Sequence, residues 1–268
     1  VDAIKRRDAF CAPEAAVDYS FHVAVKDVSG ELLNSIGDAV DYGVPSFKVF
    51  MVYDFGVTDG VFYQVLQKAK EVGALIEVHA ENNEIINTLT KEFLAEGKTD
   101  AWYHYASRPE FVEEEADKRA IAWAKATGAP LYIVHLANKG GVEAVTQAKD
   151  EGYSIYAETC PQYLEFTSDV YKLENARNFV CSPPMKGEES RQALWAAIRR
   201  GDIDTYDPEM DFVITNDKMH SDCDHTIWEG CKLHGYPVQT YSRGRLVYEN
   251  GAFLGEAGGG NFVKCKLK

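Results

Sequence analysis

The sequence lacks any apolar run long enough to cross a membrane, because no stretch approaches roughly 18 consecutive apolar residues. Residues 1–7 (VDAIKRR) are not followed by the apolar segment that is typical of a secretory signal. Basic side chains are also scarce, with 28 Lys and Arg against 42 Asp and Glu and a net charge of −14. This acidity disfavours nucleic acid and anionic membrane surfaces as partners.

Paired C-x₂-C motifs are absent too, and the six cysteines are scattered over 268 residues. Because disulfide-stabilised domains concentrate their cysteines, this distribution favours reduced thiols and a cytoplasmic location. The length allows one large domain or two smaller ones with a sizeable core. The chain begins without methionine, so we expect that further sequence precedes it.

One predicted strand contains a charge in an apolar setting. Residues 46–53 (SFKVFMVY) are rich in β-branched and aromatic side chains, which predicts a strand buried on both faces. Lys48 lies in the middle of it. An ammonium group in a closed core costs several kcal/mol unless it is paired or neutralised. Lys48 therefore either leaves the core at a strand end or has a chemical use.

Two later predicted strands end in histidine. Residues 74–81 (ALIEVHAE) contain His79, and residues 130–136 (PLYIVHL) contain His135. A single strand histidine is more often a structural core residue, and a single lysine at a strand end more often forms an ion pair. Three nitrogen-bearing side chains at or near the ends of three strands instead favour a shared site.

Strands and helices alternate along most of the chain, which predicts an α/β fold built from parallel βα units. A (β/α) barrel places its site at the carboxyl ends of its strands, where these polar residues lie. After residue 205 the pattern changes to short strands and turns, including a hairpin signal at 249–251 (ENG). The expected strands are 17–25, 46–53, 74–81, 130–136, 153–160 and 179–184, and the expected helices are 30–42, 58–72, 82–96, 109–127, 141–150 and 188–200.

Several motifs occur in a defined order along the chain: VHAEN at 78–82, ETCPQYL at 158–164, CSPP at 181–184, IDT at 203–205 and RGRLV at 243–247. Together with Lys48, His79 and His135 they resemble the cyclic amidohydrolases, and most closely the hydantoinases and dihydropyrimidinases. The resemblance covers nearly the whole chain. It implies a (β/α)₈ TIM-type barrel, incomplete here, with residues 1–205 as part of the catalytic barrel and residues 206–268 as the C-terminal portion of a small β-sandwich domain.

The resemblance also implies a site with two zinc ions. Lys48 would be N6-carboxylated by CO₂, and its carbamate would bridge both metals, while His79 and His135 would ligate one of them. Tyr53 would hydrogen-bond the tetrahedral oxyanion, and Ser182 would hold the ring amide of the substrate largely through its main chain. Burial supports this expectation for Lys48, since it lowers a lysine pKa and supplies the neutral amine that reacts with CO₂.

The implied activity is zinc-dependent opening of a hydantoin or dihydropyrimidine ring to an N-carbamoyl amino acid, by an enzyme that is commonly a homotetramer. The substrate would be a small cyclic amide. Allantoinase and dihydroorotase activities are alternatives, although a dihydroorotase should carry a basic residue for the substrate carboxylate and none is evident. A non-catalytic scaffold homologue is the remaining alternative, and the retained Lys48, His79 and His135 count against it.

Part of the family pattern is missing. The sequence contains no His-x-His pair for the other metal, and residues 206–208 (YDP) follow residues 203–205 where the last barrel strand and its general-base aspartate are expected. The substrate-binding asparagine is missing with them, and only five or six barrel strands can be counted. Either the sequence joins retained parts of a longer protein, which we favour, or it is a deletion product that alone would not hydrolyse substrate.

A second histidine and cysteine cluster could suggest a zinc knuckle. It comprises residues 220–225 (HSDCDH) together with Cys231 and His234. Its spacing fits no paired C-x₂-C scheme, so we expect no metal there.

Overall fold

The computed structural model describes residues 1–26, 30–202, 211–214, 216, 223, 225–234, 239–249 and 252–267. The chain divides into two compact units, which are described separately below. The first, here called the small unit, comprises Val1–Phe21, Asp41–Val44 and Tyr206–Lys266. The second, here called the barrel unit, comprises His22–Val40, Pro45–Thr205 and Leu267–Lys268.

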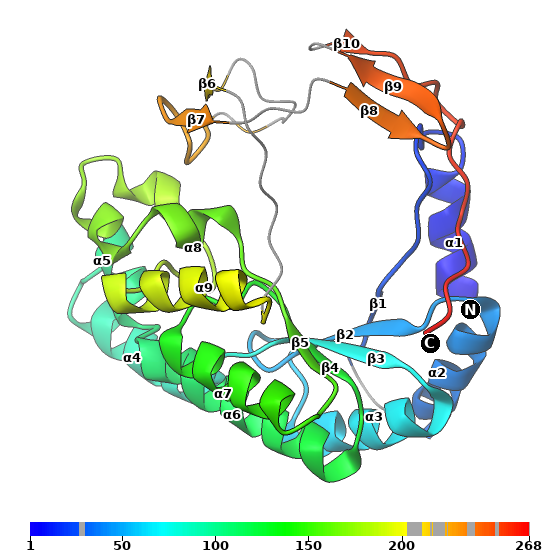
Figure 1. Ribbon diagram of the computed structural model, residues 1–268. Coiled ribbons are helices and arrows are strands. Elements are labelled where there is room, and N and C mark those ends of the chain that lie inside the picture. Colours follow the sequence, from blue (N-terminus) through cyan, green and yellow to red (C-terminus); the bar gives the residue numbers. More distant parts are fainter. Residues whose placement is uncertain are drawn as a thin grey trace. The chain divides into compact units, whose positions relative to one another are not determined.

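The barrel unit contains a sheet of five parallel strands in the order β1-β2-β3-β4-β5 (Figure 1). Sequence order and spatial order coincide, as in successive βα units. The prediction of an α/β fold with an incomplete parallel barrel is therefore confirmed, with five barrel strands among the described residues. The strands are β1 (Val23–Ala24), β2 (Ser46–Phe50), β3 (Leu75–His79), β4 (Leu131–Ile133) and β5 (Ile155–Ala157).

Helices connect these strands, and α3, α6 and α7 lie along one face of the sheet (Figure 1). None of the helices in the described ranges is both long and apolar enough to cross a membrane. The helices are α2 (Gly30–Tyr42), α3 (Asp59–Val72), α4 (Asn83–Ala95), α5 (Ala101–Ala106), α6 (Glu110–Thr127), α7 (Lys139–Asp150), α8 (Pro161–Glu165) and α9 (Glu188–Arg200), with 3₁₀ turns η1 (Ser168–Lys172) and η2 (Ala176–Phe179).

Helix α3 illustrates how local sequence fixes these elements. The Thr58 side chain accepts a hydrogen bond from the Val61 amide at the N-terminus. Gly73 ends the helix with a left-handed backbone, φ 70°, which glycine adopts without a Cβ clash. One face of the helix is fully buried at the spacing expected for an amphipathic helix. The residues of this face are Phe62, Val65, Leu66 and Ala69.

The two faces of the sheet are buried to different degrees. Alternate strand residues face the helices and are at most 2% exposed: Phe47, Val49, Ile76, Val78, Leu131, Ile133, Ile155 and Ala157. On the other face Lys48 and Phe50 are partly exposed, and Tyr156 is 46% exposed. The prediction that residues 46–53 are buried on both faces is therefore wrong, because helices cover only one face within the described ranges.

Two other strand predictions are wrong. Of residues 17–25, only Val23–Ala24 forms a strand, and Tyr19 and Phe21 join an aromatic cluster of the small unit with Phe262. Residues 179–184 form no strand, since η2 leads into an irregular loop.

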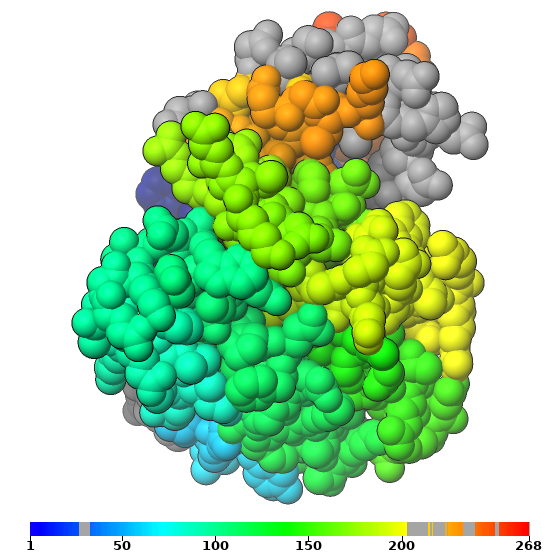
Figure 2. Space-filling view, turned by 90° about the vertical axis from the view of Figure 1, so that its left-hand side faces the viewer, coloured from blue at the N-terminus to red at the C-terminus, as the bar shows by residue number. Residues whose placement is uncertain are grey.

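Helix α5, which the sequence pattern did not predict, packs against the segment that precedes this loop. Tyr105 stacks on Tyr171 of η1 with ring centroids 5.6 Å apart. Figure 2 shows α5, residues 161–180 and α9 as one continuous surface of the barrel unit. The loop that carries Ser182 is thus supported from its N-terminal side by packed helical turns.

The small unit contains α1 (Asp2–Cys11) and two antiparallel sheets. Strands β6 (Asp211–Val213) and β7 (Lys232–His234) pair with each other, and β8 (Gln239–Ser242), β9 (Arg245–Glu249) and β10 (Ala252–Phe253) form a sheet in the order β10-β9-β8. The predicted domain boundary at 205/206 and the turn residues 250 and 251 lie outside the described residues.

Helices α6 and α7 approach so closely that a side chain cannot be accommodated at Gly141. A Cβ atom there would lie 2.3 Å from Asp117 Oδ2 and 2.6 Å from Leu136 Cδ1. Asn138, which caps α7 by accepting from the Gly141 amide at 2.6 Å, is also bonded to Asp117 at 2.9 Å. The packing of α7 on α6 therefore depends on glycine at this position.

We predict that Gly141→Ala lowers the free energy of unfolding by about 1–3 kcal/mol, because the methyl group overpacks a buried contact. Gly60→Ala is the matched control, since a Cβ atom at Gly60 in α3 meets nothing within 4 Å. That substitution should stabilise the chain by about 0.5–1 kcal/mol through helix propensity. Urea denaturation measures both values, and equal effects of the two substitutions would contradict the packing described.

Candidate active site

The structure brings the lysine and the two histidines together at the carboxyl ends of β2, β3 and β4. His79 is the last residue of β3 and lies opposite Phe50 in the register of β2 and β3. Its ring meets that of His135 edge to face, with centroids 4.5 Å apart and planes at 76°. Lys48 is close enough to repel the charged form of His135.

His135 reaches this position through an unusual backbone conformation. It lies two residues beyond β4, where simple alternation would place it on the helix-facing side with Leu131 and Ile133. Its φ of 44° is left-handed, which is uncommon for a residue with a bulky side chain. Such strain is typical of functional positions, because the surrounding structure must hold it in place.

The His135 ring is neutral over the physiological pH range. Burial lowers the pKa of His135 to about 3, and the nearby His79 and Lys48 lower it in the same direction. Its Nδ1 atom is buried and has no hydrogen-bond partner. A buried nitrogen without a partner is costly in a purely structural role, and it is available to a ligand.

Lys48 lies in a partly buried, polar environment. Burial lowers the pKa of Lys48 to about 8, although the carboxylates of Glu77 and Glu158 oppose this effect. Glu77 is the register partner of Lys48 on β3, and its Oε1 lies 2.6 Å from His22 Nδ1. A substantial fraction of the Lys48 amine is therefore neutral near pH 8.

Tyr53 lies beside the same group of residues. Its ring contacts the rings of His79, with centroids 5.4 Å apart, and of Phe50 and Phe55. Its backbone is also left-handed, φ 74°, and its amide donates to Asn83 Oδ1 at 3.1 Å. Burial raises the pKa of Tyr53, while a hydrogen bond with Ser182 acts in the opposite direction. The phenol is thus protonated at neutral pH and can donate.

Ser182 is presented by a loop that is fixed on both sides. His104 Nε2 donates to the Cys181 carbonyl at 2.8 Å, and the Tyr163 hydroxyl donates to the Pro183 carbonyl at 2.7 Å. The Met185 amide donates to the Tyr171 hydroxyl at 3.1 Å. These bonds from separate elements hold the main chain next to Tyr53.

Sequence reasoning missed a carboxylate in this site. Glu81 belongs to the VHAEN motif, but the motif alone assigned it no role. It is 0% exposed, and its Oε2 atom lies 2.7 Å from His79 Nε2. Spacing could have indicated the contact, because residues two apart on an extended strand point to the same side.

The residues present fit part of a metal centre. His79 and His135 offer imidazole nitrogens, and Lys48 would offer carbamate oxygens once carboxylated. Within the described ranges, no group of three or more His, Cys, Asp and Glu is arranged to hold a metal ion. Residues 220–222 and 224 of the possible zinc knuckle lie outside those ranges.

We predict that the acylation rate of Lys48 reaches half its maximum at about pH 8, because only the neutral amine reacts and its pKa is lowered. An ordinary exposed lysine reaches this point near about pH 10.4. Glu77→Gln should lower the midpoint further, since the Glu77 carboxylate favours the charged amine. Pulse labelling and mass spectrometry measure the midpoint, and a value near 10.4 would contradict the burial described.

Comparison with known sequences identifies relatives over most of the chain, although no family model matches. The D-hydantoinase of Geobacillus stearothermophilus is 28% identical over 340 positions, covering 94% of this chain and 72% of the relative. The D-hydantoinase of Streptomyces coelicolor is 42% identical over 193 positions, covering 70% of this chain and 41% of the relative. The first alignment spans 340 positions but includes only 94% of the 268 residues of this chain, or about 252. On the order of 90 of its positions therefore contain no residue of this chain.

Solved structures agree with this result. The dihydropyrimidinase of Brevibacillus agri matches with a TM-score of 0.93 and 27% identity, covering 99% of this chain and 77% of that one. A D-hydantoinase structure matches with a TM-score of 0.89 and the same identity and coverage. The dihydroorotase of Campylobacter jejuni, with a TM-score of 0.52 and 16% identity, shares only the fold. The chain is therefore similar over most of its length to the hydantoinases and dihydropyrimidinases, which are cyclic amidohydrolases of the amidohydrolase superfamily.

Proposed function

We propose that this chain supplies one half of a binuclear zinc site that opens a hydantoin or dihydropyrimidine ring to an N-carbamoyl amino acid. The observation that carries the proposal is the convergence of Lys48, His79 and His135 at one end of the sheet, with Tyr53 and Ser182 beside them. The names of the relatives, D-hydantoinase and dihydropyrimidinase, support this substrate class.

Three side chains would hold the metal. His79 and His135 would bind through neutral imidazole nitrogens, and Lys48 through the oxygens of a CO₂-derived carbamate. The lowered pKa of Lys48 supports carboxylation, because CO₂ reacts with the neutral amine. When bound, zinc ions supply Lewis acidity toward the ring carbonyl and activate water.

The remaining residues bind and orient the substrate. The Tyr53 phenol can donate a hydrogen bond to the oxygen that becomes negative as the carbonyl carbon turns tetrahedral. The rings of Phe50 and Phe55 pack with Tyr53 and help to fix the orientation of its ring. The fixed main chain around Ser182 offers polar groups to the ring amide.

The alternatives differ mainly in the ring. A dihydroorotase would need a free cation for the substrate carboxylate. Arg108, whose charge acts on the Tyr53 hydroxyl, is engaged by Glu81 at 3.6 Å. This contact favours an uncharged ring over dihydroorotate. Allantoinase activity differs in the ring substituent, which the substrate panel below distinguishes.

We predict that the 268-residue chain alone opens none of these rings, because it lacks the His-x-His pair and the aspartate general base. Adding the segments of the Geobacillus stearothermophilus D-hydantoinase that align where this chain has no residues should restore hydrolysis. The assay is a panel of hydantoins, dihydrouracil, allantoin and dihydroorotate with chiral product analysis. A completed, folded and zinc-loaded chain that opens no ring would contradict the proposed function, and so would hydrolysis by the chain alone.

In the completed enzyme, Tyr53→Phe should lower kcat by about 10²–10³-fold, because it removes one donor to the oxyanion while keeping the ring packing. Ser182→Ala is the matched comparison, since Ser182 is expected to act largely through its main chain. That substitution should change kcat/KM much less. Steady-state kinetics decide the matter, and similar losses for both variants would argue against the role of the Tyr53 hydroxyl.

A further inference from the structure

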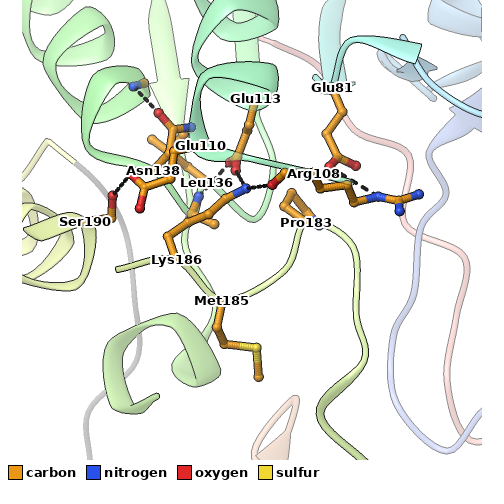
Figure 3. Close-up of polar contacts among 12 residues, drawn as sticks. Glu81, Arg108, Glu110, Glu113, Leu136, Asn138, Pro183, Met185, Lys186 and Ser190 are labelled. Atoms are coloured by element: carbon orange, nitrogen blue, oxygen red, sulfur yellow. Dashed lines mark hydrogen bonds and ion pairs between the residues drawn. The ribbon is translucent and has the colours of Figure 1, made fainter. Parts of the chain in front are cut away.

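A group of buried charges lies behind the candidate metal ligands, and Figure 3 shows it in close-up. We name it the Lys186 cluster, and it consists of Glu81, Arg108, Glu113 and Lys186. Glu81, Glu113 and Lys186 are 0%, 2% and 3% exposed. Charges buried to this degree are costly unless they compensate one another, so their presence calls for a specific role.

The cluster reaches His79 through Glu81. Glu81 Oε2 lies 2.7 Å from His79 Nε2, with the two side chains 0% and 3% exposed. The other carboxylate oxygen, Oε1, faces Arg108 Nε at 3.6 Å. A carboxylate with a cation at its second oxygen accepts hydrogen bonds, so Nε2 of His79 is the donor.

We propose that Glu81 is a positioning residue that accepts a hydrogen bond from Nε2 of His79 and so leaves Nδ1 as the ring nitrogen for the metal. The inference rests on the proposed function, in which His79 is a zinc ligand. A ligating histidine commonly donates its other ring nitrogen to a carboxylate, which fixes the tautomer and the ring orientation. Here the packing of His79 against His135 and Tyr53 constrains the same ring from the other side.

The rest of the cluster fixes Glu81 in place. Arg108 Nε lies 3.6 Å from Glu81 Oε1. Lys186 Nζ lies 3.3 Å from Glu113 Oε2 and donates to the Arg108 carbonyl at 3.2 Å (Figure 3). The positive charges of Lys186 and Arg108 both favour the carboxylate form of Glu81. The cluster thereby offsets the cost of an isolated buried anion.

The same cluster joins the two other parts of the site. Glu113 Oε1 accepts a hydrogen bond from the Ala137 amide at 2.8 Å, two residues after His135. Lys186 follows the Ser182 loop in the sequence. Glu110, which lies on α6 with Glu113, accepts a hydrogen bond from the Gly187 amide at 2.9 Å. Helix α6 thus contacts the segment after His135 through Glu113 and the segment after the Ser182 loop through Glu110.

The test begins with the metal-free chain labelled with ¹⁵N-histidine, near pH 7.5. Long-range ¹H–¹⁵N spectra, assigned by the signal lost in His79→Gln, report which ring nitrogen of His79 carries the proton. We expect a single Nε2–H tautomer. In Glu81→Gln we expect a mixture with a measurable Nδ1–H share, and in Glu81→Asp we expect partial recovery of the Nε2–H form.

Zinc titration of the same proteins gives the second readout. Glu81→Gln should weaken zinc binding about 10–100-fold. Glu115→Gln is the matched control, because Glu115 also lies on this side of the sheet, bonded to Asn82 at 2.8 Å, but does not contact His79. It should change neither readout.

The outcomes separate the two proposals. An Nδ1–H tautomer or a doubly protonated ring in the unsubstituted chain overturns the role of Glu81, and so does an unchanged tautomer in Glu81→Gln. Failure of the unsubstituted chain to bind zinc, with the Nε2–H tautomer present, instead overturns the zinc site of the proposed function. If Glu81→Gln does not fold, the tautomer of the unsubstituted chain and of Glu81→Asp still decides.

Discussion

The site depends on the cost of holding charge at the poorly hydrated end of a parallel sheet. Burial disfavours the cationic forms of Lys48 and His135 and lowers their pKa values to about 8 and about 3. The same cost acts on Glu81, whose buried carboxylate faces His79 and Arg108. One constraint therefore acts on the nitrogens in front of the site and on the carboxylate behind it.

Much of this arrangement could be predicted from the sequence. Lys48 in an apolar run, and histidines at the ends of two later strands, indicated a shared site because parallel strands carry their functional residues at one edge. Helix ends such as Thr58 and Gly73 followed from ordinary capping chemistry. These features depend on a residue and its near neighbours in the chain, so they can be predicted from the sequence alone.

Features that depend on distant contacts could not be predicted. The left-handed backbones of Tyr53 and His135 are imposed by tertiary packing. The backbone preferences of tyrosine and histidine do not predict them. Helix α5 is only six residues long and is stabilised by stacking of Tyr105 on Tyr171, far away in sequence. The role of Glu81 required knowledge of its buried partners. The one-sided burial of the sheet could not be derived from the apolar pattern of residues 46–53.

This chain is shorter than its relatives over the aligned span. The D-hydantoinase of Geobacillus stearothermophilus contributes roughly 90 more positions within the aligned span than this chain does. Burial on the open face is lower, and Tyr156 of β5 is 46% exposed.

X-ray absorption of the chain loaded with one equivalent of zinc tests the convergence of these donors most directly. We predict two imidazole nitrogens at about 2.0–2.1 Å with oxygen completing the shell. The imidazole signal should disappear in the His79→Ala, His135→Ala double variant. A shell containing sulfur at about 2.3 Å, which would place the metal on cysteines instead, would contradict the account.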